Sequence, residues 1–461
     1  MRRGSVAAGL VALLASTWAE GARAQVAAPA PETIAVGDWK LAPVVEARVR
    51  GEYWHDVDGQ DKGVLTERVR LGVDVTRGAV EGRVVLQDAR LWDLGMANDL
   101  QTGPVPLAIT GVYEAWGEAH TAGARPSFLR IGRQEVSWGE GRLLGVSDWS
   151  PTGRTLDAVR GRLVTGNWSF EVLAAALEDQ TSPVTGGSTS TVYAVAPAYG
   201  ELFGARVEWA LAPLFAIELY GLARLAQSSP VASLDSSVRG QTYTPSLRLH
   251  GADHAWTWGV EGAYQLGHAD GIGVTTAPFG SQTYAAERSA WAAAGHVAYV
   301  FEHVLLTPSV RLGGSYATGD SGGSTYHAFD PLLPDVHTGY GAMDLFTWSN
   351  ELEGNARVAI APFTDAVAAV EYRYARLAQA GGAWTTGYLD QIVGVPGNTK
   401  AELGHELDAR LAWAPWPSVE LAGGYSVLIL GDGAKALLAG SSLTPPALAH
   451  TAYLQATLRV P

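Results

Sequence analysis

Residues 66–76 read TERVRLGVDVT, and polar and apolar side chains alternate through most of this stretch. Side chains of a β-strand point alternately to its two faces. Arg68, Arg70 and Asp74 therefore share one face of a predicted strand, and three valines and a leucine share the other. In a half-buried strand of a soluble protein the apolar face would point to a core. Here the other face is so highly charged that it needs an aqueous or paired environment of its own.

The same two-faced pattern recurs in residues 352–360, 370–374 and 406–413. The apolar faces of several segments end in Trp or Tyr, as in the segments that start near residues 255 and 285. Transmembrane barrels carry rings of aromatic side chains at both membrane interfaces, an apolar outer band and a polar interior. The pattern therefore predicts strands with one face toward lipid and a charged face toward a wet lumen.

About 18 such segments follow one another, and the gaps between them are alternately tight and long. We expect the segments to start near residues 43, 65, 80, 109, 126, 156, 168, 201, 214, 241, 255, 285, 303, 349, 365, 401, 418 and 449. The tight gaps are 77–79, 121–126, 166–167, 212–213, 251–254, 301–302, 361–365 and 414–417. This rhythm predicts an all-β fold, a transmembrane antiparallel β-barrel with short periplasmic turns and long extracellular loops.

The N-terminus has the features of an export signal. It combines the cationic start Met1-Arg2-Arg3, an apolar run at 6–15 and small residues before a cleavage point after Ala24. The apolar run is too short to cross a bilayer as a helix. The expected organisation is a signal peptide at 1–24, a short periplasmic segment at 25–42 and a barrel in the cell outer membrane at 43–461.

Composition narrows the function classes further. The chain has no cysteine, which excludes disulfides and thiol chemistry. A net charge of -14 argues against nucleic-acid binding, which needs a basic surface. The 32 basic residues include only four lysines, Lys40, Lys62, Lys400 and Lys435. The rigid guanidinium fork of Arg suits paired carboxylates in a crowded interior.

Three blocks of sequence carry a family resemblance. They are 87–92 (QDARLW), 129–160, which contains GRQEVSWGEGRLLG, and 316–347, which contains YATGDSGG. A weaker block joins 403–408 (LGHELD) to 424–426. Together they resemble the alginate export family of outer-membrane barrels. The resemblance implies an eighteen-stranded, monomeric, porin-like channel that contacts outer-membrane lipid and is inserted by the barrel assembly machinery. The chain departs from the pattern at its last residue, Pro461, where such barrels usually end in Phe.

Charged side chains predicted to line the solute path include members of the inward strand faces and of one long loop. They are Arg68, Arg70, Arg90, Arg130, Arg133, Arg142, Asp148, Arg154, Asp157, Arg160, Arg248, Arg311, Arg357, Arg373 and Arg410. Carboxylates of similar number share the inward faces, so the bore is expected to be mixed in charge and weakly ion-selective. The alternative role for any of these residues is a cross-strand ion pair that braces the barrel.

The long loop from Val136 to Thr155 combines several charges with Trp138 and Trp149. Such a loop could fold into the lumen as a constriction or pack as an exterior loop, and the residues leave both readings open. An Arg cluster near this loop is the expected source of any anion preference, with Arg130, Arg142, Arg154 and Arg160 as its candidates. The segment from Thr318 to Phe346 is a second candidate for a plug.

Other motifs carry less weight. GDSGG at 319–323 matches the string around a serine-protease nucleophile, but no His and Asp partners accompany it. The spaced acids at 56–61 resemble half of a calcium loop and lack its distal Glu, so an ordinary turn is favoured. The histidines form no metal-binding pair. No catalytic residue, metal or cofactor is therefore predicted.

The sequence thus predicts a channel for passive passage of hydrophilic solutes, including small anions and saccharides or polyanions. A dedicated exporter of an alginate-like anionic polysaccharide is the alternative. A barrel-embedded hydrolase, or an adhesin that uses the polar loop 180–199, is a third class.

Overall fold

A computed structural model gives the fold. It describes residues 33–93, 107–177, 199–227, 240–253, 255–269, 275–277, 280–282, 286–320, 322, 325–337, 339–388 and 391–460. The predicted signal peptide at 1–24 and nearly all of the polar loop at 180–199 lie outside the described residues.

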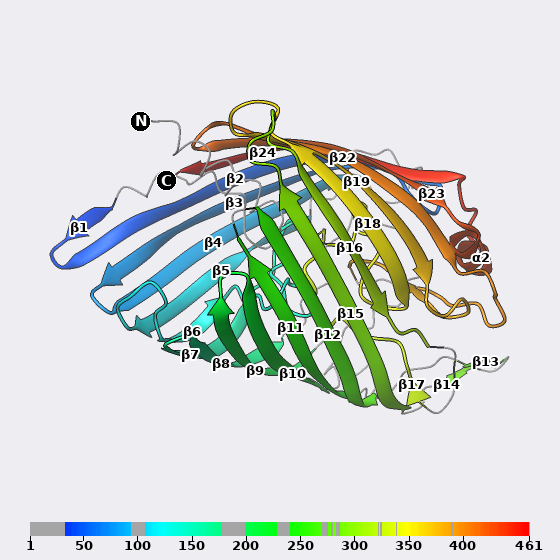
Figure 1. Cartoon of the computed structure of the whole chain (residues 1–461), viewed down its shortest axis with the longest axis horizontal. Coiled ribbons are helices and arrows are strands. Elements are labelled where there is room, and N and C mark those ends of the chain that lie inside the picture. Colours follow the sequence, from blue (N-terminus) through cyan, green and yellow to red (C-terminus); the bar gives the residue numbers. More distant parts are fainter. Residues whose placement is uncertain are drawn as a thin grey trace.

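One sheet, antiparallel throughout its wall strands, closes into a barrel of tilted strands (Figure 1). It has 20 strands in the described chain, of which the short β1 (Ile34–Val36) and β17 (Thr325–Tyr326) are not part of the 18-strand wall. The wall strands are β2 (Trp39–His55), β3 (Asp61–Arg77), β4 (Val80–Asp93), β5 (Leu107–His120), β6 (Phe128–Gln134), β7 (Leu156–Thr165), β8 (Trp168–Leu177), β9 (Tyr199–Ala212), β10 (Phe215–Gln227), β11 (Gly240–Ala252), β12 (Trp256–Ala269), β15 (Ala286–Val300), β16 (Ser309–Ala317), β18 (Glu351–Ile360), β19 (Ala366–Leu377), β22 (Glu402–Trp416), β23 (Val419–Leu430) and β24 (Leu448–Val460). The smaller elements are the hairpins β13 (Thr275–Ala277) with β14 (Gly280–Gln282) and β20 (Trp384–Thr385) with β21 (Gln391–Ile392), and helix α2 (Asp432–Gly440). The predicted fold class and strand number are confirmed.

The barrel closes where β24 pairs with β2. Val460 lies opposite Val45 at one end of this seam, and His450 lies opposite His55 at the other. β2 begins at Trp39, earlier than the expected barrel start at residue 43. The first residues of β2 extend past the end of β24 and pair with β1 instead, so β1 lies beside the N-terminal end of β2 (Figure 1).

The short connections lie at or near the predicted tight gaps, with one exception. The strand expected to start near residue 303 begins at Ser309, so the gap expected at 301–302 is a wider turn. Its backbone is held by Phe301 N donating to Pro308 O at 2.8 Å, and Leu306 and Thr307 have φ of 65° and 42°. Two consecutive left-handed residues cannot continue a strand. The prediction of a strand start near residue 303 was wrong because residues 304–306 are apolar, as in a strand, but lie in this turn.

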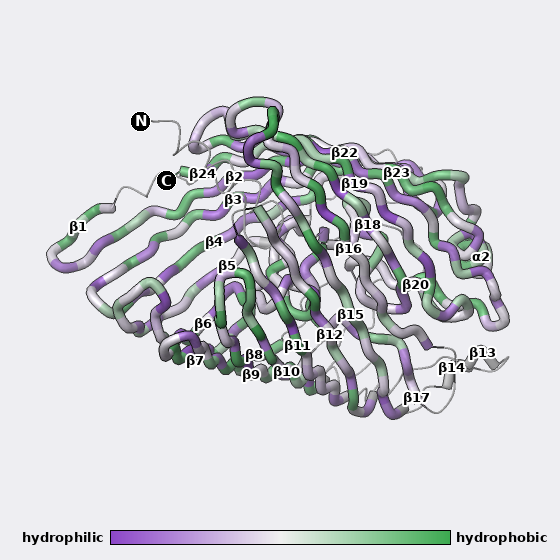
Figure 2. Tube along the Cα trace, in the orientation of Figure 1, coloured by the Kyte–Doolittle hydropathy of each residue, from purple (hydrophilic) through white to green (hydrophobic). Residues whose placement is uncertain are grey.

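The two faces of the wall differ as the alternation predicts. Arg70 is 3% exposed and its neighbour Leu71 is 53% exposed, and hydrophilic and hydrophobic residues alternate along most strands (Figure 2). Trp168 stacks on Trp209 on the outer face, with ring centroids 4.8 Å apart, beside the short turn at 166–167. Aromatic rings at such positions mark a membrane interface. No helix in the described residues is both long and apolar enough to span a membrane.

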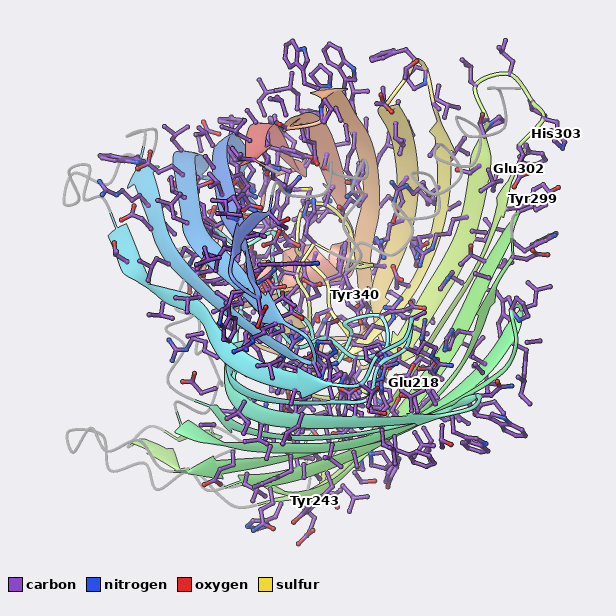
Figure 3. All side chains as sticks on the ribbon, turned by 90° about the vertical axis from the view of Figure 1, so that its left-hand side faces the viewer. Glu218, Tyr243, Tyr299, Glu302, His303 and Tyr340 are labelled. Carbon is purple, nitrogen blue, oxygen red and sulfur yellow. The ribbon has the colours of Figure 1, made fainter. Side chains whose placement is uncertain are left out.

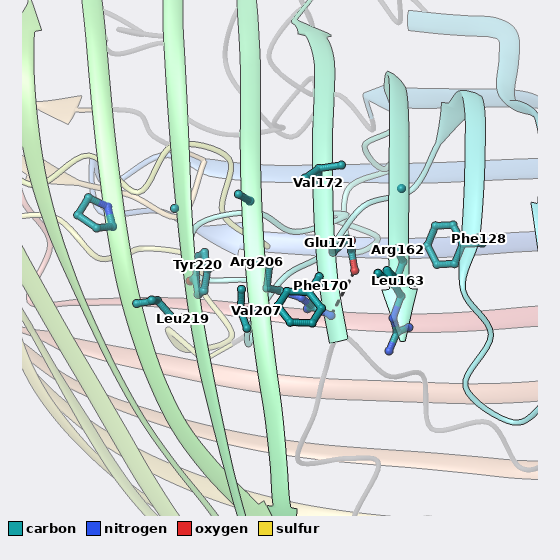
Figure 4. Close-up of a pocket in the computed structure, with 14 residues that line it drawn as sticks. Phe128, Arg162, Leu163, Phe170, Glu171, Val172, Arg206, Val207, Leu219 and Tyr220 are labelled. Atoms are coloured by element: carbon teal, nitrogen blue, oxygen red, sulfur yellow. Dashed lines mark ion pairs between the residues drawn. The ribbon is translucent and has the colours of Figure 1, made fainter. Parts of the chain in front are cut away.

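A groove of about 720 Å³ crosses the wall between β6 and β11 (Figure 4). Its apolar lining includes Leu163, Phe170 and Leu219, which are all exposed on the outer face. These apolar side chains lie on the outer face of the barrel, and Arg162, Glu171 and Arg206 of the same strands also border the groove.

Candidate functional site

Two long connections fold into the barrel instead of standing outside it. We name them the first inner loop (135–155, between β6 and β7) and the second inner loop (the described residues of 318–350, between β16 and β18). Figure 3 shows Tyr340 of the second inner loop inside the barrel, among loop segments. Of the two interpretations left open for the first inner loop, the structure shows the inward one. The predicted plug segment at 318–346 also folds inward.

The two inner loops are joined by backbone pairing. Leu144 forms a parallel bridge with Leu333, and Gly145 N donates to Leu333 O at 2.9 Å. The Arg154 guanidinium donates to the carbonyls of Leu333 and Pro334, both at 2.8 Å. Burial among neutral acceptors lowers the pKa of Arg154 to about 10, so its side chain remains charged at neutral pH. Arg154 is therefore a brace between the loops.

Apolar side chains of both inner loops form a core within the lumen. Leu143 and Leu144 have 0% exposure, as does Trp348 of the second inner loop. The hairpin β20–β21 adds Trp384, whose indole donates to Leu345 O at 2.6 Å. A core of this kind holds the loops as fixed contents of the bore.

The tip of the first inner loop lies on a cluster of wall arginines. We name residues 147–153 the tongue, and the arginine cluster is Arg48 and Arg50 of β2 with Arg68 and Arg70 of β3. Arg48 donates to Asp148 O at 2.7 Å and to Ser150 O at 2.9 Å. Arg50 donates to Trp149 O at 2.9 Å. Arg68 and Arg70 bind Asp148 Oδ1 at 3.0 and 3.1 Å.

The arginine cluster holds more cations than its carboxylates balance. Glu46 binds Arg68 at 2.5 Å, and Glu52 pairs with Arg50. Asp148 supplies the third carboxylate, and Glu46 also binds Arg459 at 3.2 Å. The four arginines of the cluster thus face three carboxylates, one of which is shared, and Arg48 and Arg50 also donate to backbone carbonyls of the tongue.

Trp149 fixes the tongue between two flat groups. Its ring lies 3.8 Å from the Arg50 guanidinium and stacks on the His337 imidazole at 3.7 Å and 4°. Such cation–π and stacking contacts are worth about 0.5–2 kcal/mol each. Trp149 therefore links the arginine cluster to the second inner loop.

The second inner loop rests on a different wall. Glu406 of β22 accepts hydrogen bonds from the backbone N–H groups of Ala342 at 2.8 Å and Met343 at 3.1 Å. Arg373 of β19 donates to Gly339 O at 3.1 Å and pairs with Glu353 and Glu371. This part of the loop is held by charged groups of both signs.

A third charged contact joins the first inner loop to the wall at β11 and β15. Glu140 of the first inner loop contacts Arg248 of β11 and His296 of β15, both at 3.4 Å. Burial would raise the pKa of Glu140, but the positive charges of Arg142 and Arg248, together with that of His296 when its imidazole is protonated at low pH, hold it at about 2. Glu140 thus remains a carboxylate over the whole physiological pH range.

The structure places most of the predicted path residues at the bore. On the inner wall lie Arg68, Arg70, Arg130, Arg160, Arg248, Arg311, Arg357, Arg373 and Arg410, and on the first inner loop lie Arg142, Asp148 and Arg154. Many are ion-paired, as Arg130 is with Glu118 at 2.7 Å and Arg160 with Glu171 at 2.5 Å. Of the four arginines expected to form one cluster, these two lie in separate pairs. The cluster that touches the loop is made of Arg48, Arg50, Arg68 and Arg70.

Three predicted path residues point away from the bore. Arg90 pairs with Asp88 on the outer face of β4, and Arg133 pairs with Asp157 at 2.6 Å across β6 and β7. Arg90, Arg133 and Asp157 are each an odd number of residues from the inward Gln87, Arg130 and Arg160. Alternation therefore puts them on the outer face. Placing them in the lumen was wrong.

Sequence reasoning missed the aromatic partners in the second inner loop. His337 stacks on Trp149, and Tyr340 lies 5.1 Å from the Arg142 guanidinium. Both residues belong to the block at 316–347 that carries the family resemblance. That block was the available signal, but no strand periodicity gives the direction of its side chains.

The acidic motif at 56–61 and the described residues of the GDSGG string form ordinary turns. Lys62 Nζ lies 2.7 Å from Asp56 and 3.3 Å from Asp58, so an ammonium group stands where a calcium ion would bind. Asp320 of the GDSGG string accepts backbone N–H groups of Gly322 and His327. Within the described residues, no group of three or more His, Cys, Asp or Glu side chains could hold a metal.

Comparison with solved structures identifies the barrel type. The outer membrane protein OpdK from Pseudomonas aeruginosa aligns with a TM-score of 0.52 and 12% identity, over 90% of this chain and 98% of that one. OccK2 (OpdF) of the same organism gives 0.55 and 11%, over 91% and 97%. At these identities the likeness shows the fold, that of an outer-membrane porin.

The sequence itself was compared with curated proteins and with family models. None of the curated proteins matches it. The model of the alginate export family matches residues 44–439, which include most of the barrel wall and both inner loops. The chain therefore belongs to the alginate export family.

Proposed function

We propose that the protein is a passive outer-membrane channel for small hydrophilic solutes, with a preference for carboxylated saccharides. The observation that carries this proposal is the pair of inner loops. They are bonded to each other and to the inner wall, and they share a buried core. A bore narrowed by two such loops suits solutes of one or a few sugar units better than a polymer.

The preference for carboxylates rests on the arginine cluster. Guanidinium groups bind carboxylates in a bidentate manner and replace part of the hydration shell of a solute. Two fold relatives are described as complexes, OpdK with vanillate and OccK2 (OpdF) with glucuronate. Both ligands carry a carboxylate. The acids on the inner wall keep the average field modest, so we expect weak anion selectivity.

An exporter of an alginate-like anionic polysaccharide is the second candidate. The family match over residues 44–439 favours it. A polymer would need the inner loops to move aside along the whole bore, whereas a small solute needs only local space between them. On either proposal the chain acts as a monomer, without a cofactor.

Planar-bilayer recording separates these proposals. We expect a reversal potential that shows weak anion selectivity, block by glucuronate, and little further gain in affinity for uronate oligomers beyond a few units. Block that strengthens steadily with oligomer length would favour the exporter. A strongly cation-selective pore that ignores uronates would contradict both, and a chain that conducts nothing would point to a function in the external loops.

A further inference from the structure

The tongue presents only acceptors to the arginine cluster. In the hydrogen bonds that join them, the wall donates from Arg48, Arg50, Arg68 and Arg70, and the tongue accepts through oxygens of Asp148, Trp149 and Ser150. A neighbouring wall residue continues this pattern, because Gln87 donates to Thr152 O at 2.9 Å. The tongue thus offers a row of oxygen atoms to a cationic surface, as a carboxylated solute would.

Most of these oxygens are weaker partners than a solute carboxylate. Arg48 donates to three carbonyls, those of Asp148, Trp149 and Ser150. Hydrogen bonds from a guanidinium to a carboxylate are shorter and stronger than those to a neutral acceptor. A solute carboxylate that reached the arginine cluster would therefore replace neutral acceptors with a charged one.

The neck of the tongue is held by hydrogen bonds of its own. Arg154 N donates to Val146 O at 2.6 Å and closes the neck of the tongue. The Arg154 side chain ties the same neck to Gly145 O at 3.0 Å and to the second inner loop. The contacts of the tip with the arginine cluster are separate from this brace. A hinge at the neck would therefore release residues 147–153 once the ring contacts of Trp149 with His337 and Tyr453 are also broken.

We propose that the tongue is an intramolecular competitor for the carboxylate group of the solute. In the resting channel it covers the arginine cluster. A uronate displaces it, binds the same guanidinium groups and widens the bore beside β2 and β3. This inference rests on the proposed function, because it takes the arginine cluster as the solute-binding surface, and it adds that solute binding opens the channel.

Single cysteines test the displacement, because the native chain has none. Ser150 in the tongue has 0% exposure, and Ser426 on the inner wall of β23 has 2%. Ser150→Cys and Ser426→Cys are near-isosteric variants that differ in whether the residue lies in the tongue. Each is incubated with a small neutral methanethiosulfonate reagent, with glucuronate or with the same concentration of glucose.

We expect glucuronate to speed modification of Ser150→Cys at least threefold over glucose, and to leave Ser426→Cys unchanged. Trp149→Ala, which removes the stack on His337 and on Arg50, should raise modification of the Ser150→Cys chain without any uronate. Equal rates in glucuronate and glucose would overturn the proposal.

A liposome-swelling assay on the same proteins separates the two levels of argument. If glucuronate enters the liposomes but does not speed modification of Ser150→Cys, the competitor role is wrong and the proposed function stands. If glucuronate neither enters nor changes the rate, both are wrong.

Discussion

The arginine cluster and the wall under residues 339–343 anchor two inner loops by different chemistry. The tongue accepts hydrogen bonds from guanidinium groups, mostly through neutral backbone carbonyls. Backbone N–H groups of the second inner loop donate to Glu406, and its Gly339 carbonyl accepts a hydrogen bond from Arg373. Arg373 in turn pairs with Glu353 and Glu371. Neutral acceptors on a cationic wall can be exchanged for an anion. A segment held by both buried cations and buried anions cannot be displaced by an anion alone.

This comparison separates a movable part from a fixed part of the constriction. The four predictions below test the separation, and the first has the largest expected effect.

Loss of Arg373 should break the fixed wall. Arg373→Leu removes a buried cation that pairs with both Glu353 and Glu371, and the loss of one partner of a buried ion pair typically costs about 3–5 kcal/mol. Arg48→Leu removes donors from neutral carbonyls and should cost only about 1–3 kcal/mol. Urea unfolding of the refolded barrels in detergent micelles measures both. Equal losses of unfolding free energy in the two variants would mean that the two inner loops are not anchored by different chemistry.

A methyl group at Gly341 should loosen the second inner loop. Gly341 has φ +95°, and an added Cβ would lie 2.6 Å from Glu406 Oε1. Gly341→Ala should therefore cost about 1–3 kcal/mol through backbone strain and displacement of the carboxylate. Gly166→Ala is the matched control, because Gly166 has φ +55° with nothing within 4 Å of the added Cβ. If both variants lose the same stability, contact with Glu406 does not matter.

Removal of the tongue's carboxylate should make it easier to displace. Asp148→Asn replaces a charged acceptor of Arg68 and Arg70 with a neutral one, at a cost of about 1 kcal/mol. We expect higher single-channel conductance and a stronger anion preference. Asp157→Asn, on the outer face, removes an acid from the ion pair with Arg133 and should leave conductance unchanged. A conductance change of the same size in both would contradict a specific role for the tongue.

The smallest effect concerns pH. Glu140 has an ordinary pKa of 4.5 and a folded pKa of about 2, so its contribution to stability is present above pH 4.5 and is lost as the pH falls toward 2. The contacts of Glu140 with Arg248 and His296 should therefore persist at pH 5, and conductance should not change between pH 7 and 5 on its account. The difference between native protein and Glu140→Gln, recorded in bilayers over this range, should be constant. A difference that disappears by pH 5 would show that Glu140 has already been protonated.

Alternation predicted the wall well because one rule governs every strand. Residues 66–76 gave the correct faces for Arg68, Arg70 and Leu71, since side-chain direction depends only on position along the strand. The same rule, applied without exception, would have excluded Arg90 and Arg133. The turn before Ser309 was harder to foresee, because residues 304–306 are apolar and only their backbone conformation ends the strand.

The contents of the bore could be predicted only in part. Two tryptophans and several charges made the first inner loop a candidate for inward folding. Its partners could not be read from the sequence, because the stack of Trp149 on His337 joins residues far apart in the chain and depends on two irregular loops at once. Arg48 and Arg50 lie two residues apart on the inner face of β2, as alternation requires, but alternation says nothing about which loop they hold.

The short strand β1 has a consequence for the assembly of the barrel. Barrel shear is set by the register in which the last strand meets the first. A slip that carried Val460 from Val45 to Leu41 would keep every side chain of β24 on its own face, so hydrophobic matching alone would not reject it. Leu41 already pairs with Ile34 of β1. Strand β1 therefore occupies the edge of β2 that a slipped β24 would need. It favours the observed register, and with it the observed shear, where hydrophobic matching alone would not.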